Sequence, residues 1–267
     1  MKNLEKICRQ TCELAKQAGD FIRQEQKRFL FSSVEHKGFN DLVSYVDKSA
    51  EKILVEGLQK ILPGSGFITE ENTLSIRGKE FQWIIDPLDG TTNFVHGVPC
   101  YCISIALMQN EELVTGVIYE INQDECFYAW HASPAFLNNK EIKVSGVDQL
   151  KNSLLATGFP YTNFERMKPY MEVFDFCMRE THGLRRLGSA AVDLAYVAAG
   201  RFEGFYEYGL NSWDVAAGAF IIQQAGGKVS DFSGGSNFIF GKEIIATNSG
   251  IFREFLEVVN KKFENGN

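Results

Sequence analysis

The chain has 267 residues, which is long enough for one large domain or for two closely packed halves around a substantial core. Hydrophobic residues at 45% and charged residues at 23% are close to the average of globular proteins. The net charge of −7 argues against nucleic-acid backbone binding as a main activity, and no apolar run approaches the roughly 18 residues of a membrane span. We therefore expect a cytoplasmic protein that binds neither nucleic acid nor a membrane.

Two amphipathic helices are predicted to open the chain. Apolar residues recur at helical spacing over residues 2–30 and again over residues 42–61. The polar stretch 32–41 between them reads as a loop that could lie over a site. Asp47 lies near the beginning of the second helix, where capping is the ordinary role of such a residue.

The run Trp83–Phe94, Trp-Ile-Ile-Asp-Pro-Leu-Asp-Gly-Thr-Thr-Asn-Phe, combines an apolar strand with a helix start. Pro87 cannot donate to a sheet ladder, so we expect the strand to end at Asp86, with Asp89 just beyond its carboxyl end. Gly90 allows a tight turn, and the short polar side chains after it suit the start of a helix. The free N–H groups of a helix start bind phosphate well.

Carboxylates beside a phosphate-binding turn imply a divalent cation, because they repel phosphate unless a cation lies between them. Residues 66–69 look like a short strand that delivers Glu70, and two neighbouring strand ends would bring Glu70 close to Asp86. Taken alone, Asp-Pro-Leu-Asp-Gly is also an ordinary turn in which Asp side chains bond to nearby backbone. The combination favours Mg²⁺-assisted chemistry on a phosphate ester.

Consecutive strands with short turns follow, so the first half is expected to be helices packed on an antiparallel meander. These strands cover residues 100–108, 113–119 and 126–130, with a further hairpin over 136–144. Polarity rises near residues 144–152. The predicted division is therefore an amino-terminal α+β half, residues 1–147, and a smaller carboxy-terminal α/β half, residues 148–267.

The second half alternates strands and helices and holds further candidate positions. Gly188-Ser-Ala190 opens a helix of small residues, and a segment over 201–206 leads into Glu207. Asp214 lies in the first turn of a helix that begins at Trp213. An ionised carboxylate there needs a partner, because its unpaired burial is costly; a metal and a helix cap are the two candidates.

With these segments assembled, the chain resembles the inositol monophosphatase family along essentially its whole length. Three motifs carry the resemblance in order: the Glu70-Glu71 pair, the Trp83–Phe94 run, and Trp-Asp-Val-Ala-Ala-Gly from Trp213 to Gly218. Thr69 is a small departure, because Gly commonly precedes the Glu pair. The resemblance implies an αβαβα layered sandwich, usually a homodimer, that hydrolyses phosphate monoesters with two or three Mg²⁺ and is sensitive to lithium.

The resemblance also assigns roles to residues. Glu70, Asp86 and the Leu88 carbonyl would hold the first metal, and Asp86, Asp89 and Asp214 the second. Asp47, Thr91 and Glu70 match the catalytic positions, of which Asp47 and Thr91 orient the attacking water. The implied substrate-binding residues are Asp89, Gly90 and Thr91 around the phosphate and Ser189, Ala190 and Glu207 around the hydroxyl-bearing part. His96, the histidine nearest the central motif, is expected to be structural.

A small phosphorylated polyol, above all myo-inositol 1-phosphate, is the implied substrate. Fructose 1,6-bisphosphate, 3′-phosphoadenosine 5′-phosphate and histidinol phosphate are alternatives that need the same chemistry. An interaction module in a transcription or RNA-maturation complex is an alternative from another class. The retention of all four acidic candidate ligands favours catalysis over a role in binding alone.

Overall fold

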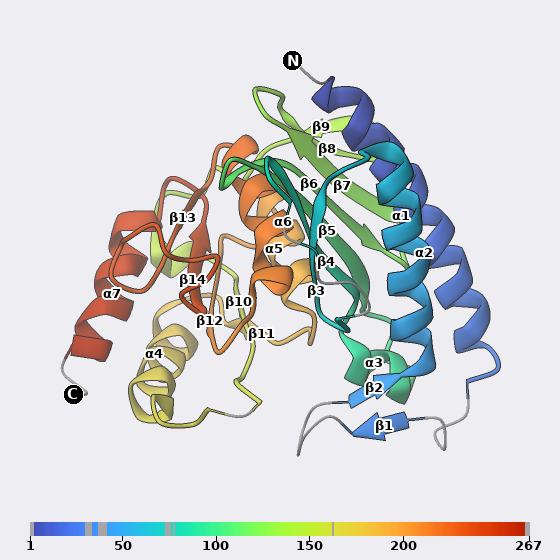
Figure 1. Ribbon diagram of the computed structural model, residues 1–267. Coiled ribbons are helices and arrows are strands. Elements are labelled where there is room, and N and C mark those ends of the chain that lie inside the picture. Colours follow the sequence, from blue (N-terminus) through green and yellow to red (C-terminus); the bar gives the residue numbers. More distant parts are fainter. Residues whose placement is uncertain are drawn as a thin grey trace.

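The computed structural model describes residues 3–29, 34–36, 42–72, 76, 78–161 and 163–264. Helices and sheets alternate in five layers (Figure 1), which confirms the predicted αβαβα sandwich. The helices, from one outer layer through the middle to the other, are α1 (Leu4–Gln26) and α2 (Tyr45–Ile61), then α5 (Ala190–Ala198) and α6 (Ser212–Gln224), then α4 (Met167–Glu180) and α7 (Phe252–Glu264).

The larger sheet has seven strands in the order β3-β4-β5-β6-β7-β8-β9, and the pairs from β4 to β9 are antiparallel, as the meander predicts. β3 is parallel to β4, and Thr69 pairs with Ile85. Glu70 and Asp86, each one residue further on, therefore lie side by side. The strands are β3 (Gly66–Thr69), β4 (Phe81–Asp89), β5 (Cys102–Gln109), β6 (Glu112–Glu120), β7 (Glu125–Trp130), β8 (Ala135–Leu137) and β9 (Lys140–Ile142).

Two predicted boundaries are wrong. β4 does not end at Asp86 but continues to Asp89, which pairs with Cys102 after a register shift between Asp86 and Asp89. Pro87 is tolerated because it lies in this irregular part of the ladder, where its missing N–H costs no regular bond. Residues 42–44 form the strand β2 (Leu42–Ser44), paired with β1 (Val34–His36), rather than the first turn of a helix. The remainder of the predicted loop 32–41 lies outside the described residues.

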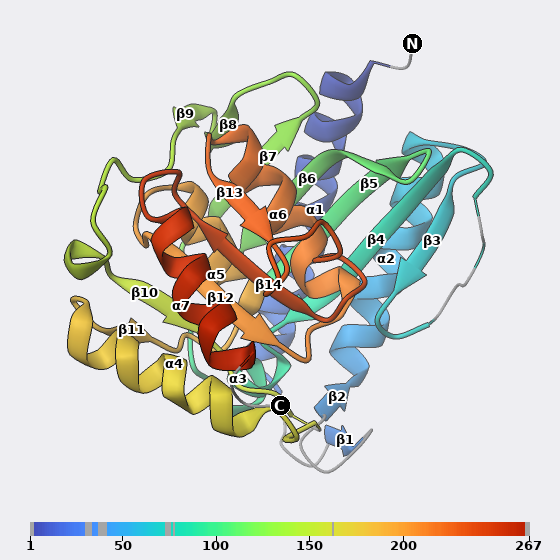
Figure 2. The ribbon, with the colours of Figure 1, turned by 90° about the vertical axis from the view of Figure 1, so that its left-hand side faces the viewer.

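The smaller sheet has five strands in the order β11-β10-β12-β14-β13. β10 is parallel to both β11 and β12, whereas β14 is antiparallel to β12 and β13. Figure 2 shows α4 and α7 in front of this sheet. The strands are β10 (Leu155–Thr157), β11 (Leu184–Arg185), β12 (Gly204–Tyr208), β13 (Lys228–Ser230) and β14 (Glu243–Thr247); the short helices are α3 (Thr91–His96) and the 3₁₀ turn Leu150–Asn152.

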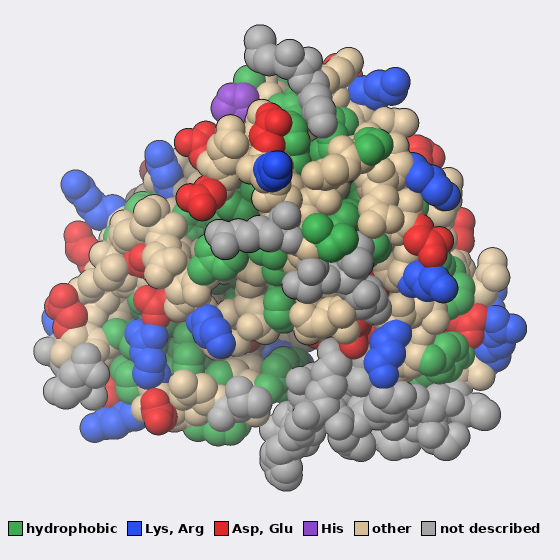
Figure 3. Space-filling model, in the orientation of Figure 1, with side chains coloured by type: hydrophobic (Ala, Val, Ile, Leu, Met, Phe, Trp, Pro, Cys, Tyr) green, Lys and Arg blue, Asp and Glu red, His purple; other side chains and the backbone are tan. Residues whose placement is uncertain are grey.

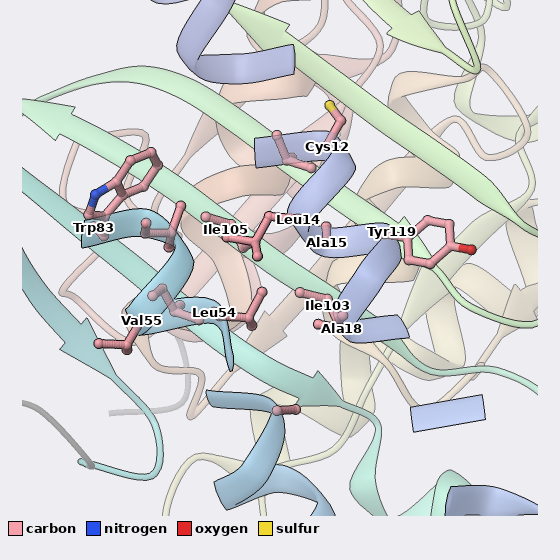
Figure 4. Packing of buried hydrophobic residues seen from close by; sticks show 14 of the residues in the cluster. Cys12, Leu14, Ala15, Ala18, Leu54, Val55, Trp83, Ile103, Ile105 and Tyr119 are labelled. Carbon is pink, nitrogen blue, oxygen red and sulfur yellow. The ribbon is translucent and has the colours of Figure 1, made fainter. Parts of the chain in front are cut away.

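Among the described residues, three hydrophobic clusters fill the spaces between the layers. Figure 4 shows the first, in which Leu14, Leu54 and Trp83 pack between the outer helices and the larger sheet. The second surrounds α5 and α6, which are buried between the two sheets and are therefore apolar on almost every side. β6 approaches α6 so closely that a Cβ at Gly116 would lie 2.7 Å from the Ala217 carbonyl oxygen. The helices α5 and α6 of the predicted second half bury apolar side chains against the sheet of the first half. The division between residues 147 and 148 stays a prediction.

No helix among the described residues is long and apolar enough to cross a membrane. On the face shown in Figure 3, acidic and basic side chains are interspersed over the described surface without a basic stripe.

Candidate functional site

A cavity of about 280 Å³ lies where the end of β4, the start of α3 and β12 meet the first turns of α5 and α6. Among the described residues that line it, Arg186 is the only basic side chain. Six carboxylate side chains line it: Glu70, Asp86, Asp89, Asp193, Glu207 and Asp214. Such an excess of negative charge in one cavity calls for cations.

Three of these carboxylates form one cluster. A carboxylate oxygen from each of Asp86, Asp89 and Asp214 lies within 4.8 Å of the others. Burial, together with repulsion from Glu70, Asp89 and Asp214, raises the pKa of Asp86 well above its usual range. Burial and the charge of Asp89 likewise raise the pKa of Asp214. Each carboxylate therefore destabilises the ionised form of its neighbours.

Hydrogen bonds hold each member of the cluster in place. Asp86 Oδ1 accepts from the Leu88 N–H at 2.9 Å, within the irregular last part of β4. Asp89 Oδ2 accepts from Ser189 Oγ at 2.6 Å and from the Ala191 N–H at 2.7 Å. Burial raises the pKa of Asp89 to about 6, and these two hydrogen bonds oppose the rise. The amino-terminal turn of α5 thus holds a carboxylate supplied by β4.

Asp214 caps the start of α6, and a helix cap is one of the two partners predicted for its carboxylate. Its Oδ2 accepts from the Asn211 N–H at 2.6 Å at the start of α6. Ser104 Oγ on β5 donates to the Trp213 carbonyl at 3.0 Å and fixes this helix start against the larger sheet. Capping does not exclude metal binding, because a carboxylate has several lone pairs.

Asp47 and Thr91 come together although they are far apart in the sequence. Thr91 Oγ1 lies 2.9 Å from Asp47 Oδ1 and 3.0 Å from the Leu88 carbonyl oxygen. Asp47 Oδ2 accepts from the Ser44 N–H at 2.8 Å and from Ser44 Oγ at 2.6 Å. Burial raises the pKa of Asp47 against these bonds. Asp47 does not line the cavity itself and reaches it through Thr91.

The turn between β4 and α3 needs the backbone freedom of glycine. Gly90 has φ +94°, and a Cβ there would lie 3.0 Å from the Cys100 carbonyl oxygen. Asn93 of α3 donates from Nδ2 to the Cys100 carbonyl at 2.7 Å and to the Leu187 carbonyl at 2.9 Å, which ties this turn to the segment before α5. His96 is exposed and does not line the cavity.

Ser189, Ala190 and Glu207, predicted to contact the substrate, all line the cavity. The Ser189 hydroxyl also caps α5, because it accepts from the Val192 N–H at 3.3 Å while donating to Asp89. Glu207 is packed against Gly158, where a Cβ would lie 2.1 Å from its Oε2. Burial and the charge of Asp89 raise the pKa of Glu207 to about 8.

Several lining residues were not predicted. Arg186 and the turn at residues 158–161 carry no motif of their own. Asp193 lies four residues after Ser189, so helical spacing from the Gly188-Ser-Ala190 motif contained a signal for it.

The cluster suits a hard divalent cation. Its described donors are carboxylate oxygens, Leu88 lines the same cavity, and the described metal-ligand cluster contains no His nitrogen or Cys sulfur. Oxygen donors of this kind are typical of Mg²⁺, and the mutual repulsion of buried carboxylates is relieved by a cation.

The fold and site define an αβαβα sandwich with a partly buried carboxylate cluster at the end of a sheet strand. The sequence pattern of the inositol monophosphatase family matches residues 3–266, and the chain belongs to this family.

Relatives and solved structures are similar over nearly the whole chain. The Nus factor SuhB of Pseudomonas aeruginosa is 40% identical over 250 residues, covering 92% of each chain. The inositol-1-monophosphatase of Mesorhizobium japonicum is 40% identical over 251 residues, covering 93% of this chain and 94% of the relative. The crystal structure of the extragenic suppressor protein suhB from Bartonella henselae has a TM-score of 0.88 and 40% identity, covering 93% and 96% of the two chains.

Proposed function

We propose that this protein is a Mg²⁺-dependent phosphate monoester hydrolase and that it converts myo-inositol 1-phosphate to myo-inositol and phosphate. The observation that carries the proposal is the cluster of Asp86, Asp89 and Asp214, of which Asp86 is buried and the other two are partly buried, in the wall of a polar cavity. Family membership and the inositol-1-monophosphatase of M. japonicum support it. Two or three bound Mg²⁺ would supply activation of water and stabilisation of the leaving oxygen.

Different groups in the cavity would bind the metal ions and the phosphate. Glu70, Asp86 and the Leu88 carbonyl would hold one ion, and Asp86, Asp89 and Asp214 a second. The backbone N–H groups of Gly90 and Thr91 would bind the phosphate at the start of α3, where the dipole favours an anion.

Water positioning is the proposed task of Asp47, Thr91 and Glu70. The Thr91 hydroxyl, held 2.9 Å from Asp47 Oδ1, has a fixed orientation at the cavity wall. A water bound to that hydroxyl and to Glu70 would be aligned for in-line attack on phosphorus, and precise alignment of this kind removes much of the entropic barrier. Ser189, Ala190 and Glu207 would surround the hydroxyl-bearing part of the substrate.

Phosphate release from a substrate panel tests the proposal. The panel contains myo-inositol 1-phosphate, fructose 1,6-bisphosphate, 3′-phosphoadenosine 5′-phosphate and histidinol phosphate, each with Mg²⁺, with EDTA and with added Li⁺. We expect turnover of myo-inositol 1-phosphate that needs Mg²⁺ and is inhibited by Li⁺. A higher kcat/KM for another compound of the panel would make that compound the proposed substrate. If folded protein that binds Mg²⁺ hydrolyses none of the four compounds, the proposal is contradicted.

A second function, association with a transcription complex, is favoured by the 40% identity to the Nus factor SuhB of P. aeruginosa. Co-purification of transcription components with wild type and with Asp89→Asn separates the two functions. Equal recovery with both would assign association to a surface away from the carboxylate cluster, whereas no recovery with either would argue against it.

The proposal includes a homodimer. Exposed apolar side chains follow one another along α4 and the segment before it, including Phe164 at 54% and Met178 at 52% exposure. A second copy would remove this apolar surface from water. Light scattering at several protein concentrations gives the oligomeric state, and a monomer at all of them would contradict this part.

A further inference from the structure

Asp193 on α5 is a buried carboxylate that lacks the partners its neighbours have. It is 1% exposed and lines the cavity, yet its Oδ1 has no hydrogen-bond partner among the described residues. Asp86, Asp89 and Asp214 each accept at least one backbone hydrogen bond. A buried polar atom left without a partner is costly, so a site that retains one is expected to fill it with a ligand or water.

The charges around Asp193 limit what that ligand can be. Burial, followed by the charges of Glu207 and Asp89, raises the pKa of Asp193 well above its usual range, and the charge of Arg186 opposes this. A second phosphate or carboxylate would meet the repulsion of Glu207 and Asp193. A cation at Asp193, in contrast to one at the carboxylate cluster, would be repelled by Arg186, whose charge already acts on Asp193. A neutral group with O–H donors meets neither penalty and fits a carboxyl in either protonation state.

The position of Asp193 suits a ring-sized substrate. Ser189 is hydrogen-bonded to Asp89 in the carboxylate cluster, and Asp193 follows it by one turn of the same helix. Four residues of helix advance about 6 Å, which is comparable to the distance across a hydroxylated six-membered ring. A phosphate held near the cluster would thus place its polyol part between Glu207 and Asp193.

We propose that Asp193 is a specificity-determining residue that accepts a hydrogen bond from a ring hydroxyl of a polyol phosphate, and that it selects against leaving groups without hydroxyls. This rests on the proposed phosphatase function and adds a residue to its substrate site. Asp193 and Glu207 would each accept a hydrogen bond from a hydroxyl of the leaving group.

The test compares myo-inositol 1-phosphate with 4-nitrophenyl phosphate, which has no free hydroxyl, in wild type, Asp193→Ala and Asp193→Asn. The measured quantity is the ratio of the two kcat/KM values. We expect Asp193→Ala to lower this ratio by about tenfold or more, mainly through a higher KM for the inositol phosphate. Asp193→Asn keeps one acceptor oxygen and should lower the ratio less. Asp175→Asn, on the exposed face of α4, is the matched control and should leave the ratio unchanged.

An unchanged ratio in Asp193→Ala would overturn the role of Asp193 while leaving the phosphatase in place. An equal loss with both substrates would also overturn it, because a purely structural residue gives that result. Wild type that hydrolyses 4-nitrophenyl phosphate but no inositol phosphate would overturn the proposed substrate, and this inference with it.

Discussion

Ser189 Oγ lies 2.6 Å from Asp89 Oδ2, so the residue that caps α5 also donates a hydrogen bond to a carboxylate at the end of β4. Replacing Ser189 with Ala removes this bond and the bond from the Val192 N–H. We expect a loss of about 2 kcal/mol in the free energy of unfolding and a higher Mg²⁺ requirement for activity. Urea unfolding and a Mg²⁺ titration of activity measure both, with the exposed Ser236→Ala as the control. An unchanged Mg²⁺ requirement would show that the hydroxyl does not orient Asp89.

Asp89→Asn keeps the shape of the side chain and removes its charge from the cluster. We expect turnover to fall by at least about a hundredfold, because one ligand charge is lost while the bonds from Ser189 and Ala191 still have an acceptor. Asp214→Asn should behave in the same way, and the exposed His96→Ala should retain activity. Circular dichroism checks that each variant is folded. Full activity in Asp89→Asn would contradict the assignment of two metal ions to this site.

Metal removal should change stability as well as activity. Asp86, Asp89 and Asp214 repel one another without a cation, so Mg²⁺ at about 100 times its Kd should add about 2.7 kcal/mol. Thermal unfolding in EDTA and in Mg²⁺ measures the shift. In EDTA, Asp214→Asn should unfold at a higher temperature than wild type, because one repelling charge is gone. A lower temperature there would contradict the repulsion argument, because the substituted side chain still offers an acceptor to the Asn211 N–H.

Asp231, in the loop after β13, contributes separately to the stability of the protein in acid. Burial opposes ionisation of Asp231, but hydrogen bonds from the Ser233 hydroxyl and from the N–H groups of Gly235 and Asn237 lower its pKa. Its stabilising contribution is therefore complete above the unfolded-state pKa of about 3.9 and is lost as the pH falls through the lower folded-state pKa. Asp231→Asn should cost about 2 kcal/mol at neutral pH.

The pH dependence identifies the cause. Urea unfolding of wild type and Asp231→Asn should give a difference in the free energy of unfolding that is constant above pH of about 5 and shrinks as the pH falls through the lowered pKa of folded Asp231. A difference independent of pH would assign the effect to packing and not to the charge.

Gly90 offers a test of the turn that precedes α3. Gly90→Ala combines positive-φ strain with a contact of 3.0 Å to the Cys100 carbonyl, whereas Gly64 has φ +83° and nothing within 4 Å of a Cβ. Gly64→Ala should cost about 1 kcal/mol from strain alone, and Gly90→Ala more than that, with loss of activity. If urea unfolding shows that both substitutions lower the free energy of unfolding equally, the backbone near Cys100 shifts to accommodate the added Cβ.

Local patterns in the sequence predicted the parts of the site that depend on neighbouring strands. Glu70 and Asp86 come together because β3 and β4 are adjacent and parallel, and two strands close in sequence commonly pair. The convergence of Asp214 on Asp86 followed from the family resemblance, because no local pattern fixes a contact between such distant segments.

Other features depended on tertiary contacts. The donation from Ser189 to Asp89 and the link from Asn93 to Leu187 join the two halves, and turn or cap chemistry alone does not select these partners. The end of β4 was mispredicted because Pro87 removes only a donor, and pairing resumes at Asp89 once the register has shifted.

The assembly of the carboxylate cluster from β4 and α6 has a consequence for protein synthesis. A ribosome makes Asp86 and Asp89 early and Asp214 much later, and α6 packs against strands β13 and β14 that follow it. A nascent or truncated chain therefore cannot form the complete cluster, even when its larger sheet has folded. Cation binding by the complete cluster would therefore require a chain that has been synthesised through α6.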